Sequence, residues 1–243
     1  MRNDRPRFRR ILLKLSGEAL SAGQGSAIDP QIVQRIAQEI KSVHNLGVQI
    51  GIVIGGGNIF RGLRAEAYGM DRVVADHMGM LATVINSLAL GGALKSVGLN
   101  AKVMTAIEMR GVAELFVRDR AINHLDNDAV VIFGAGTGNP YFTTDTAATL
   151  RASEIGADAL LKATKVDGVY DADPVQNPKA KFFSRLSYRA VIEKQLQAMD
   201  LTAISLAMDQ GLPIVVFNLL KEGNILRVVS GEPVGTLITG EEK

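Results

Sequence analysis

The sequence predicts an α/β protein whose central sheet is largely parallel and covered by helices on both faces. Two observations predict it. Short apolar runs that end in glycine or small polar residues alternate along the chain with segments of helical periodicity, and that alternation is typical of such sheets. Several of the runs are apolar throughout, which is the pattern of strands that are buried on both faces.

Seven segments carry the strand pattern. Because ligands of open parallel sheets gather at the carboxyl ends of the strands, the residues that follow these runs are the first candidates for a site. The expected strands are Ile11–Leu15, Gln49–Ile54, Ala101–Ala106, Ala129–Phe133, Ala159–Lys162, Ile214–Phe217 and Thr236–Ile238.

Helical signals lie between these strands. Asp29 is suited to cap a helix that starts at Pro30 and closes at Gly47. The segment 71–97 predicts one long apolar helix, or two helices interrupted near Gly91 and Gly92. A further helix is expected over 144–155, and the turn-rich, non-periodic stretch 170–183 predicts a long surface loop.

Bulk properties favour one compact domain over residues 1–243. The chain is 47% hydrophobic, which is enough for a well-buried core, and its net charge of +2 gives no case for nucleic-acid binding. It has no cysteine, which excludes disulfides and thiolate metal sites and fits a reducing cytoplasm. No uninterrupted apolar run approaches the roughly 18 residues of a membrane span, so no membrane association is expected. Residues 1–9 are interpreted as a flexible basic tail.

The first candidate site segment follows the first strand. Lys14 lies inside an apolar run, where a cation is costly to bury unless it meets an anion. Ser16 and Gly17 come directly after it and allow backbone N–H groups to face a phosphate. The alternative is an edge-strand lysine that reaches solvent.

A second segment, Gly55-Gly56-Gly57, ends the next strand, and Arg61 follows. Consecutive glycines suit a tight turn or a close approach to a ligand, and an arginine can fork onto phosphate oxygens. An ordinary tight turn remains the alternative.

A third glycine-rich segment, 134–140, leads into Thr143, Thr144 and Asp145 at a helix start. Hydroxyls and backbone amides at a helix N-terminus suit a phosphate. Asp145 cannot attract an anion, so it would orient a metal, a lysine or the acceptor, unless it is only a helix-terminal charge.

The fourth segment, 161–174, mixes cations, carboxylates and an aromatic ring, and would suit an adenine and ribose or a simple surface turn. The chain has no G-x-x-x-x-G-K-[ST] motif, no G-x-G-x-x-G after the first strand and no protein-kinase signature. The three histidines are too widely spaced for a metal-ligand pattern.

These four segments together resemble the amino acid kinase superfamily, and within it the bacterial branch that phosphorylates UMP. The resemblance covers nearly the whole chain. Its most specific stretches are Val53–Arg61 (VIGGGNIFR), Asp76–Thr83 (DHMGMLAT), Gly134–Asp145 (GAGTGNPYFTTD) and Leu161–Val169 (LKATKVDGV).

The resemblance implies the following roles. Lys14, Arg61 and Asp145 would be catalytic, with Asp145 organising the lysine and metal positions. The ATP site would consist of Lys14, Leu15, Ser16, Gly17, Gly57, Arg61, Thr164, Tyr170 and Asp173. The UMP site would consist of Gly56, Asp76, Thr137, Gly138, Asn139, Pro140, Tyr141, Phe142, Thr143 and Thr144, with Asp76 on the ribose hydroxyls.

The resemblance also implies a three-layer α/β/α sandwich, Mg²⁺ that accompanies ATP, and a homohexamer inhibited by UTP. The product would be UDP, for pyrimidine nucleotide synthesis in the cytoplasm. The chain departs from many relatives over 22–27, and at Gly91 and Lys95, where they carry groups associated with GTP activation. Weak or absent GTP activation is therefore expected.

Two other classes of protein fit less well. A superfamily member that phosphorylates a small carboxylate or carbamate would need a different acceptor pocket. A non-catalytic nucleotide sensor or storage protein would be expected to lack the lysine or the aspartate, but Lys14, Arg61, Asp76 and Asp145 are all present.

Overall fold

The computed structural model describes residues 6–22, 26–60 and 69–240. Its strands are β1 (Arg10–Leu15), β2 (Gln49–Ile54), β3 (Asn100–Thr105), β4 (Glu114–Leu115), β5 (Ala129–Gly134), β6 (Ala159–Thr164), β7 (Val169–Tyr170), β8 (Phe182–Phe183), β9 (Arg185–Ser187), β10 (Ile214–Asn218) and β11 (Thr236–Thr239). Its helices are η1 (Gly17–Leu20, 3-10), α1 (Pro30–His44), α3 (Arg72–Ser96), α4 (Arg118–Asp126), α5 (Thr144–Glu154), α6 (Tyr188–Glu193), α7 (Leu201–Gln210) and α8 (Asn224–Val229).

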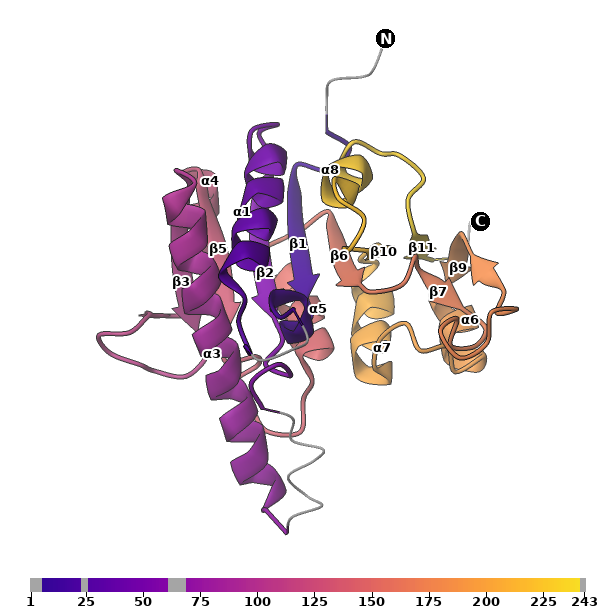
Figure 1. Ribbon diagram of the computed structural model, residues 1–243, viewed down its shortest axis with the longest axis horizontal. Coiled ribbons are helices and arrows are strands. Elements are labelled where there is room, and N and C mark those ends of the chain that lie inside the picture. Colours follow the sequence, from indigo (N-terminus) through magenta and orange to yellow (C-terminus); the bar gives the residue numbers. More distant parts are fainter. Residues whose placement is uncertain (1–5, 23–25, 61–68, 241–243) are drawn as a thin grey trace.

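Nine strands form one sheet in the order β4-β3-β5-β2-β1-β6-β10-β11-β9. All neighbouring pairs are parallel except β10 and β11. Helices α1, α3 and α8 cover one face of the sheet, and α4, α5 and α7 cover the other (Figure 1). The predicted three-layer, mainly parallel α/β/α sandwich is confirmed.

Two cores lie on opposite faces of the sheet because side chains alternate along each strand. On β1, Ile11, Leu13 and Leu15 pack with α1, α3 and α8. Leu12 points the other way and packs with α5 and α7. Lys14 shares the parity of Leu12, so the strand period turns it toward α5. All seven predicted strands are present, and each boundary agrees within one residue or two.

The predicted interruption of the long helix at Gly91 and Gly92 is wrong, because α3 runs unbroken from Arg72 to Ser96. A Cβ atom on Gly91 would lie 3.0 Å from Val103 Cγ2. Gly91 therefore brings the helix close to β3 and does not break it. The predicted loop over 170–183 is wrong at its ends, where β7 and β8 pair as a two-stranded antiparallel sheet.

Helix α3 is long and apolar. Among the described residues it is the one helix that could cross a membrane by length and composition, and 44% of its apolar stretch is buried. Polar residues are scattered along it, so it contains no long uninterrupted apolar run. Its buried side packs onto α1, β3 and β5, which is how a core helix behaves.

Candidate active site

Two lysines lie side by side at the carboxyl end of the sheet. Lys14 on β1 and Lys162 on β6 are register partners in neighbouring parallel strands, and both face α5. Asp145, in the first turn of α5, lies between them. Its Oδ1 is 2.7 Å from Lys14 Nζ, and its Oδ2 is 2.6 Å from Lys162 Nζ. One carboxylate therefore separates two ammonium groups that would otherwise repel each other.

All three charges are largely buried, with side chains between 10% and 15% exposed. Burial alone would raise the pKa of Asp145, but the charges of Lys14 and Lys162 outweigh it, so this pKa is lowered. Burial lowers the pKa of Lys162, while Asp145 opposes that shift. Asp145 is thus held as an anion by its two neighbours.

Lys162 has a further partner on the side away from Lys14. Its Nζ donates to the carbonyl oxygen of Ala198 at 2.6 Å, just before Asp200 caps α7. The carboxylate of Asp200 accepts from the hydroxyls of Thr143 and Thr146 at the start of α5. The start of α7 is therefore joined both to Lys162 and to the helix that carries Asp145.

The glycine-rich turns after β1 and β2 pack directly against each other. A Cβ atom on Gly17 would lie 2.4 Å from Asn58 Oδ1 and 2.5 Å from the carbonyl oxygen of Gly55. Asn86, fully buried on α3, donates to the Gly55 oxygen at 2.7 Å and exchanges hydrogen bonds with Asn58. Glycine is required at position 17 because the two turns touch there.

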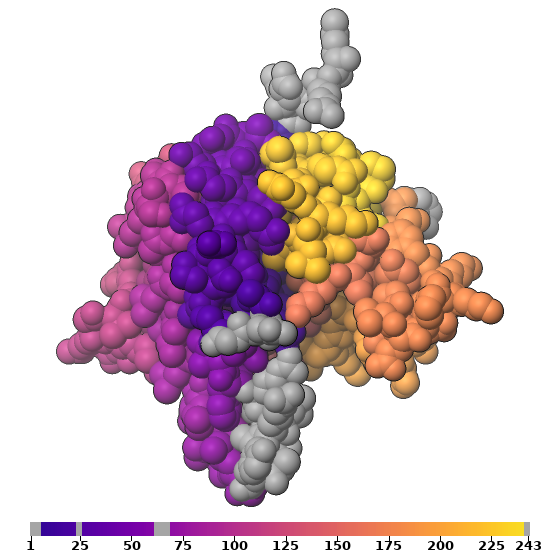
Figure 2. All heavy atoms as spheres, in the orientation of Figure 1, coloured from indigo at the N-terminus to yellow at the C-terminus, as the bar shows by residue number. Residues whose placement is uncertain are grey.

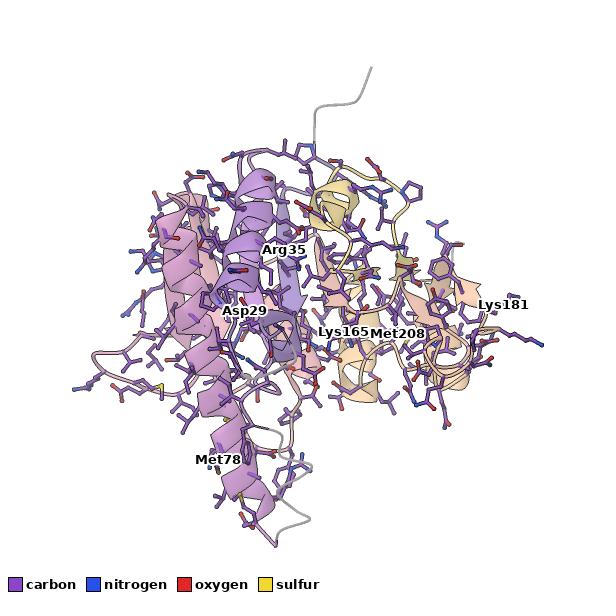
Figure 3. All side chains as sticks on the ribbon, viewed as in Figure 1. Asp29, Arg35, Met78, Lys165, Lys181 and Met208 are labelled. Carbon is purple, nitrogen blue, oxygen red and sulfur yellow. The ribbon has the colours of Figure 1, made fainter. Side chains whose placement is uncertain are left out.

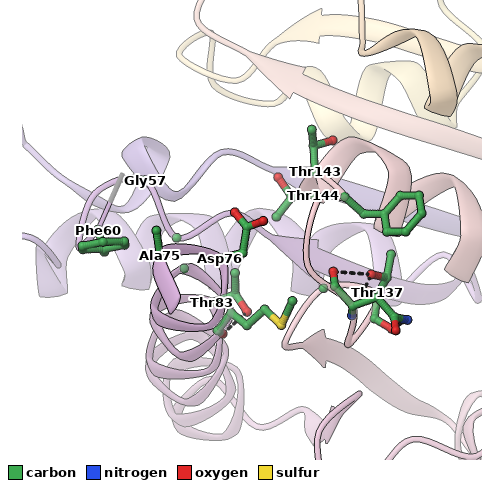
Figure 4. Close-up of a pocket in the computed structure, with 14 residues that line it drawn as sticks. Gly57, Phe60, Ala75, Asp76, Thr83, Thr137, Thr143 and Thr144 are labelled. Carbon is green, nitrogen blue, oxygen red and sulfur yellow. Dashed lines mark hydrogen bonds between the residues drawn. The ribbon is translucent and has the colours of Figure 1, made fainter. Parts of the chain in front are cut away.

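A pocket opens beside these turns, between α3 and the segment that joins β5 to α5 (Figure 4). Asp76 on α3 faces Thr144 at the start of α5 across this pocket. Its wall combines glycines, hydroxyls and one carboxylate with apolar side chains. The lining residues are Gly56, Gly57, Phe60, Ala75, Asp76, Gly79, Met80, Thr83, Gly136, Thr137, Asn139, Phe142, Thr143 and Thr144.

We call this pocket the α3 pocket. Thr83 fixes its wall. Its hydroxyl donates to the Met80 oxygen at 2.7 Å and accepts from the Ala135 N–H at 2.8 Å. Ala135 is buried and has a φ of 62°, a left-handed conformation that a non-glycine residue seldom adopts. The hydrogen bond from its N–H helps to hold the segment 135–143 in place over α3.

Asp76 is held at the mouth of the α3 pocket. Arg72 Nε lies 2.9 Å from Asp76 Oδ2, which also accepts from the backbone N–H of Tyr141 at 2.7 Å. The Arg72 guanidinium lies over the Tyr141 ring, 5.4 Å from its centroid. A carboxylate has about four lone-pair sites, so Asp76 keeps the capacity to accept further hydrogen bonds.

A second pocket lies beyond β6, on the other side of Lys14 in the strand order. It is lined by Val166, by residues 168–174, which include Tyr170 and Asp173, and by residues 195–197. Tyr170 packs edge-on against Phe182, with ring centroids 5.4 Å apart. We call this the β6 pocket. Thr164 lies at the end of β6 and does not line this pocket. Its hydroxyl donates to the carbonyl oxygen of Val166 at 2.8 Å.

Ion pairs hold the loop after β6 on both of its sides. Lys165 Nζ lies 3.2 Å from Glu18 Oε2 on η1. Asp167 accepts from Lys221 at 2.8 Å and from Asn218 at 3.0 Å, and these hydrogen bonds lower the pKa of Asp167. The loop between β6 and the β6 pocket is thus connected to η1 and to the end of β10.

Most of the predicted site residues meet at one edge of the sheet. Lys14 meets Asp145 directly, and Asp76, Thr137, Asn139, Phe142, Thr143 and Thr144 line the α3 pocket with Gly56 and Gly57. Gly138, Pro140 and Tyr141 belong to the same segment but do not line the pocket. Gly57, expected on ATP, lies with Gly56 in the α3 pocket. Arg61 lies outside the described residues.

Sequence reasoning missed four residues of this region. Lys162 stands out only as a second lysine in a buried strand, and Asp200 only as a polar residue before an apolar helical run. Thr83 and Asn86 look like ordinary helix residues, since their partners are distant in the chain. Strand parity is the signal that could have paired Lys162 with Lys14.

Within the described residues, no group of three or more His, Cys, Asp and Glu side chains could hold a metal ion. His44 and His124 instead pair with Asp128 and Glu114, respectively. Mg²⁺ that is carried by a nucleotide needs only one or two protein carboxylates, because substrate phosphates supply further ligands. Asp145 is the carboxylate of the cluster that such an ion could meet.

Replacing Asp145 with Asn leaves two buried ammonium groups without their common counter-ion. We expect Asp145→Asn to lower the free energy of unfolding by about 3–5 kcal/mol at neutral pH. The pKa of Asp145 is lower in the folded chain than its ordinary value of 3.8, so its contribution is complete above that pH and is lost only as the pH falls below it. Urea unfolding at pH 7 and at pH values below 3.8 checks the size of the loss and its pH dependence. Equal free energies of unfolding for wild type and Asp145→Asn at pH 7 would contradict the expectation.

Comparisons with known proteins agree with this geometry. Residues 9–218 match the model of the amino acid kinase family. The uridylate kinase of Aeromonas salmonicida is 57% identical over 236 residues, which cover 97% of each chain. The structure of UMP kinase from Bacillus anthracis matches with a TM-score of 0.94 at 46% identity, covering 97% of both chains. The UMP kinase structure from Ureaplasma parvum gives 0.91 at 36%, covering 96% of this chain and 99% of that one. The chain belongs to the amino acid kinase family and, within it, to the uridylate kinases.

Proposed function

We propose that this protein transfers the γ-phosphoryl group of ATP to UMP and so forms UDP. The observation that carries the proposal is the Lys14–Asp145–Lys162 cluster, which lies at the carboxyl edge of the sheet on β1, β6 and the first turn of α5. The uridylate and UMP kinases that the chain resembles support UMP as the acceptor. We place the reaction in the cytoplasm, as a step of pyrimidine nucleotide synthesis.

The two pockets differ in the chemistry that they offer. The α3 pocket has the hydroxyl of Thr144 and the N-terminal end of α5 for a monophosphate, and Asp76 for ribose hydroxyls. The β6 pocket has Tyr170 and Asp173 for an adenosine group. UMP would therefore occupy the α3 pocket, and ATP would extend from the β6 pocket toward Gly17 and Lys14.

Phosphoryl transfer needs in-line positioning and positive charge around the migrating group. Lys14 and Lys162 supply two fixed cations, and Asp145 holds both in place. The turns at Gly17 and Gly55 pack against each other, so the backbone that follows β1 lies beside the backbone that follows β2 at this edge. Mg²⁺ bound to the ATP phosphates would neutralise part of their charge.

The acceptor is tested by measuring ATP consumption with Mg²⁺ against UMP, CMP, dTMP, AMP, GMP, carbamate, N-acetylglutamate and aspartate. We expect turnover with UMP alone, because UMP is the acceptor of the relatives that match the whole fold. Turnover only with a carboxylate or carbamate would replace the acceptor assignment. Nucleotide binding by folded protein without any turnover would favour a sensing or storage role.

Lys14 provides a test of the catalytic cluster. Lys14→Ala removes a donor that would stabilise charge on the transferring group, so kcat should fall about 10²–10³-fold. Arg61→Ala should lose a similar factor if Arg61 bridges the two phosphate groups, as the family resemblance implies. Lys179→Ala is the control because Lys179 is an exposed lysine remote from the cluster. A Lys14→Ala variant within threefold of wild type would contradict its role.

We also propose that the chain assembles with copies of itself, as a homohexamer. Helix α3 projects beyond the sheet, and the surface shows it standing out from the body of the molecule (Figures 1 and 2). Five apolar side chains on its outer face are 38–50% exposed, and Met78 is visible on the projecting part (Figure 3). They are Val74, Met78, Leu81, Ile85 and Leu88.

The spacing of this α3 stripe supports contact with another helix. Successive members are four, three, four and three residues apart, which is the repeat of helices that pack together along a seam. The pattern favours a second helix as the covering surface. A second copy of α3 would supply the same apolar surface in return, as a two-fold contact requires.

A charge in the α3 stripe should disrupt this association. Leu81→Asp would bury an unpaired carboxylate at the contact, so the particle should become smaller in light scattering coupled to size-exclusion chromatography. Val175→Asp is the control, since Val175 is an exposed apolar residue in a distant loop. An unchanged mass for Leu81→Asp would exclude the stripe as the interface.

We further propose inhibition by UTP at the acceptor site, and weak or absent activation by GTP. Gly91 is buried against β3 and Lys95 is an exposed lysine near the end of α3, so these two positions offer one cation in all. Residues 23–25 of the other departing stretch lie outside the described residues.

A further inference from the structure

Asp200 makes more hydrogen bonds than the cap of its own helix requires. Its Oδ1 accepts from the Ala203 N–H at 3.0 Å, which is the ordinary capping bond of α7. Its Oδ2 also accepts from the Thr143 hydroxyl at 2.5 Å, and its Oδ1 accepts from the Thr146 hydroxyl at 3.0 Å. Two of the three partners therefore lie at the start of α5, where Thr143 is the N-cap and Thr146 is in the first turn.

The Thr143 hydroxyl is fully used by these contacts. It accepts from the backbone N–H groups of Asp145 and Thr146, at 3.0 and 3.2 Å, and so caps α5. Its one proton goes to Asp200. The hydroxyl is thus held in the rotamer that caps the helix, and it has no proton left for a ligand in the α3 pocket.

Only an acceptor without protons can hold both threonines in this way. An ionised carboxylate accepts at both oxygens, whereas an asparagine would present an NH₂ group to one of them. An NH₂ group opposite Thr143 would leave its hydroxyl proton without an acceptor and would compete for its lone pairs. The arrangement therefore depends on the charge state of residue 200 as well as on its size.

The helix start that Asp200 holds carries two parts of the proposed site. Thr143 and Thr144 line the α3 pocket, and Asp145 holds Lys14 and Lys162. The segment that leads into Asp200 also receives the Lys162 ammonium group at the Ala198 oxygen. One short segment thus contacts both the helix that carries the aspartate and one of the two lysines.

We propose that Asp200 is a positioning residue for phosphoryl transfer, acting through Thr143 on the start of α5. It touches neither pocket, and it fixes the direction of the first-turn N–H groups and of Asp145 relative to the acceptor. The inference rests on the proposed function, since it assigns the residue a part in that reaction. A mere cap of α7 would need only the bond to Ala203.

A double-mutant cycle separates positioning from capping. Asp200→Asn and Thr143→Val each break the same contact, so each should lower kcat/KM for UMP about tenfold, the cost of a hydrogen bond to a charged group. The double variant should lie within about twofold of the less active single variant, because either single change already breaks the Thr143–Asp200 hydrogen bond. KM for ATP should stay within about twofold in all three, since the β6 pocket is untouched.

Two further variants serve as controls. Asp29→Asn makes the same change at the N-cap of α1, where Asp29, labelled in Figure 3, accepts from the N–H groups of Gln31 and Ile32. Because an asparagine oxygen caps a helix about as well as an aspartate oxygen, this variant should leave the kinetics unchanged. Thr143→Ser keeps the hydroxyl and should stay within about threefold of wild type. Kinetic losses that multiply in the double variant, or an Asp200→Asn variant that behaves like Asp29→Asn, would overturn the proposal.

If Asp200→Asn does not fold, the comparison of Thr143→Val with Thr143→Ser decides, and equal kinetics for the two would overturn the proposal. The acceptor is established on the wild-type enzyme first. A wild type that uses another monophosphate refutes the choice of UMP, and the cycle is then run with that acceptor. If the wild type turns over UMP but the losses of Asp200→Asn and Thr143→Val multiply in the double variant, only the role of Asp200 is refuted.

Discussion

The site depends on one carboxylate that lies between two buried lysines. Lys14 and Lys162 are register partners on adjacent strands, so without Asp145 two cations would face each other in a poorly hydrated region. Asp145 leaves the trio with a net charge of +1, and Asp200 nearby brings the local sum to zero. A nucleotide phosphate would meet cations that are already oriented.

The topology explains how Asp145 reaches both lysines. Helix α5 leaves β5 and leads to β6, and in the sheet β2 and β1 lie between these two strands. The helix must therefore cross over β1 on the face to which strand parity turns Lys14 and Lys162. Because its N-terminus lies at the carboxyl edge, its first turn arrives beside the lysines. The order of the strands thus creates the cluster.

Sequence patterns predicted those parts of the site that lie next to a recognisable strand or helix in the chain. Glycines after β1 and β2 and hydroxyls before α5 stand next to apolar strands, so their place at the carboxyl edge follows from the fold class. The contact of Asp200 with Thr143 spans 57 residues, and no periodicity reports it. Gly91 was misread for a similar reason, since its role in close packing against Val103 is visible only once β3 lies beside α3. The short helices α4, α6, α7 and α8 also went unpredicted.

Helix α3 connects the α3 pocket to the proposed subunit contact. Met80 and Thr83 face the pocket and the segment above it, whereas Met78, Leu81 and Ile85 form part of the exposed stripe. Gly56 packs so closely on this helix that a Cβ atom would lie 2.8 Å from Ala82 Cβ and from the Gly79 oxygen. Any shift of α3 at a subunit contact would therefore have to move the turn at Gly56 or open a gap beside it. Because packed interiors do not deform continuously, association along the stripe would restrict the positions open to the pocket wall.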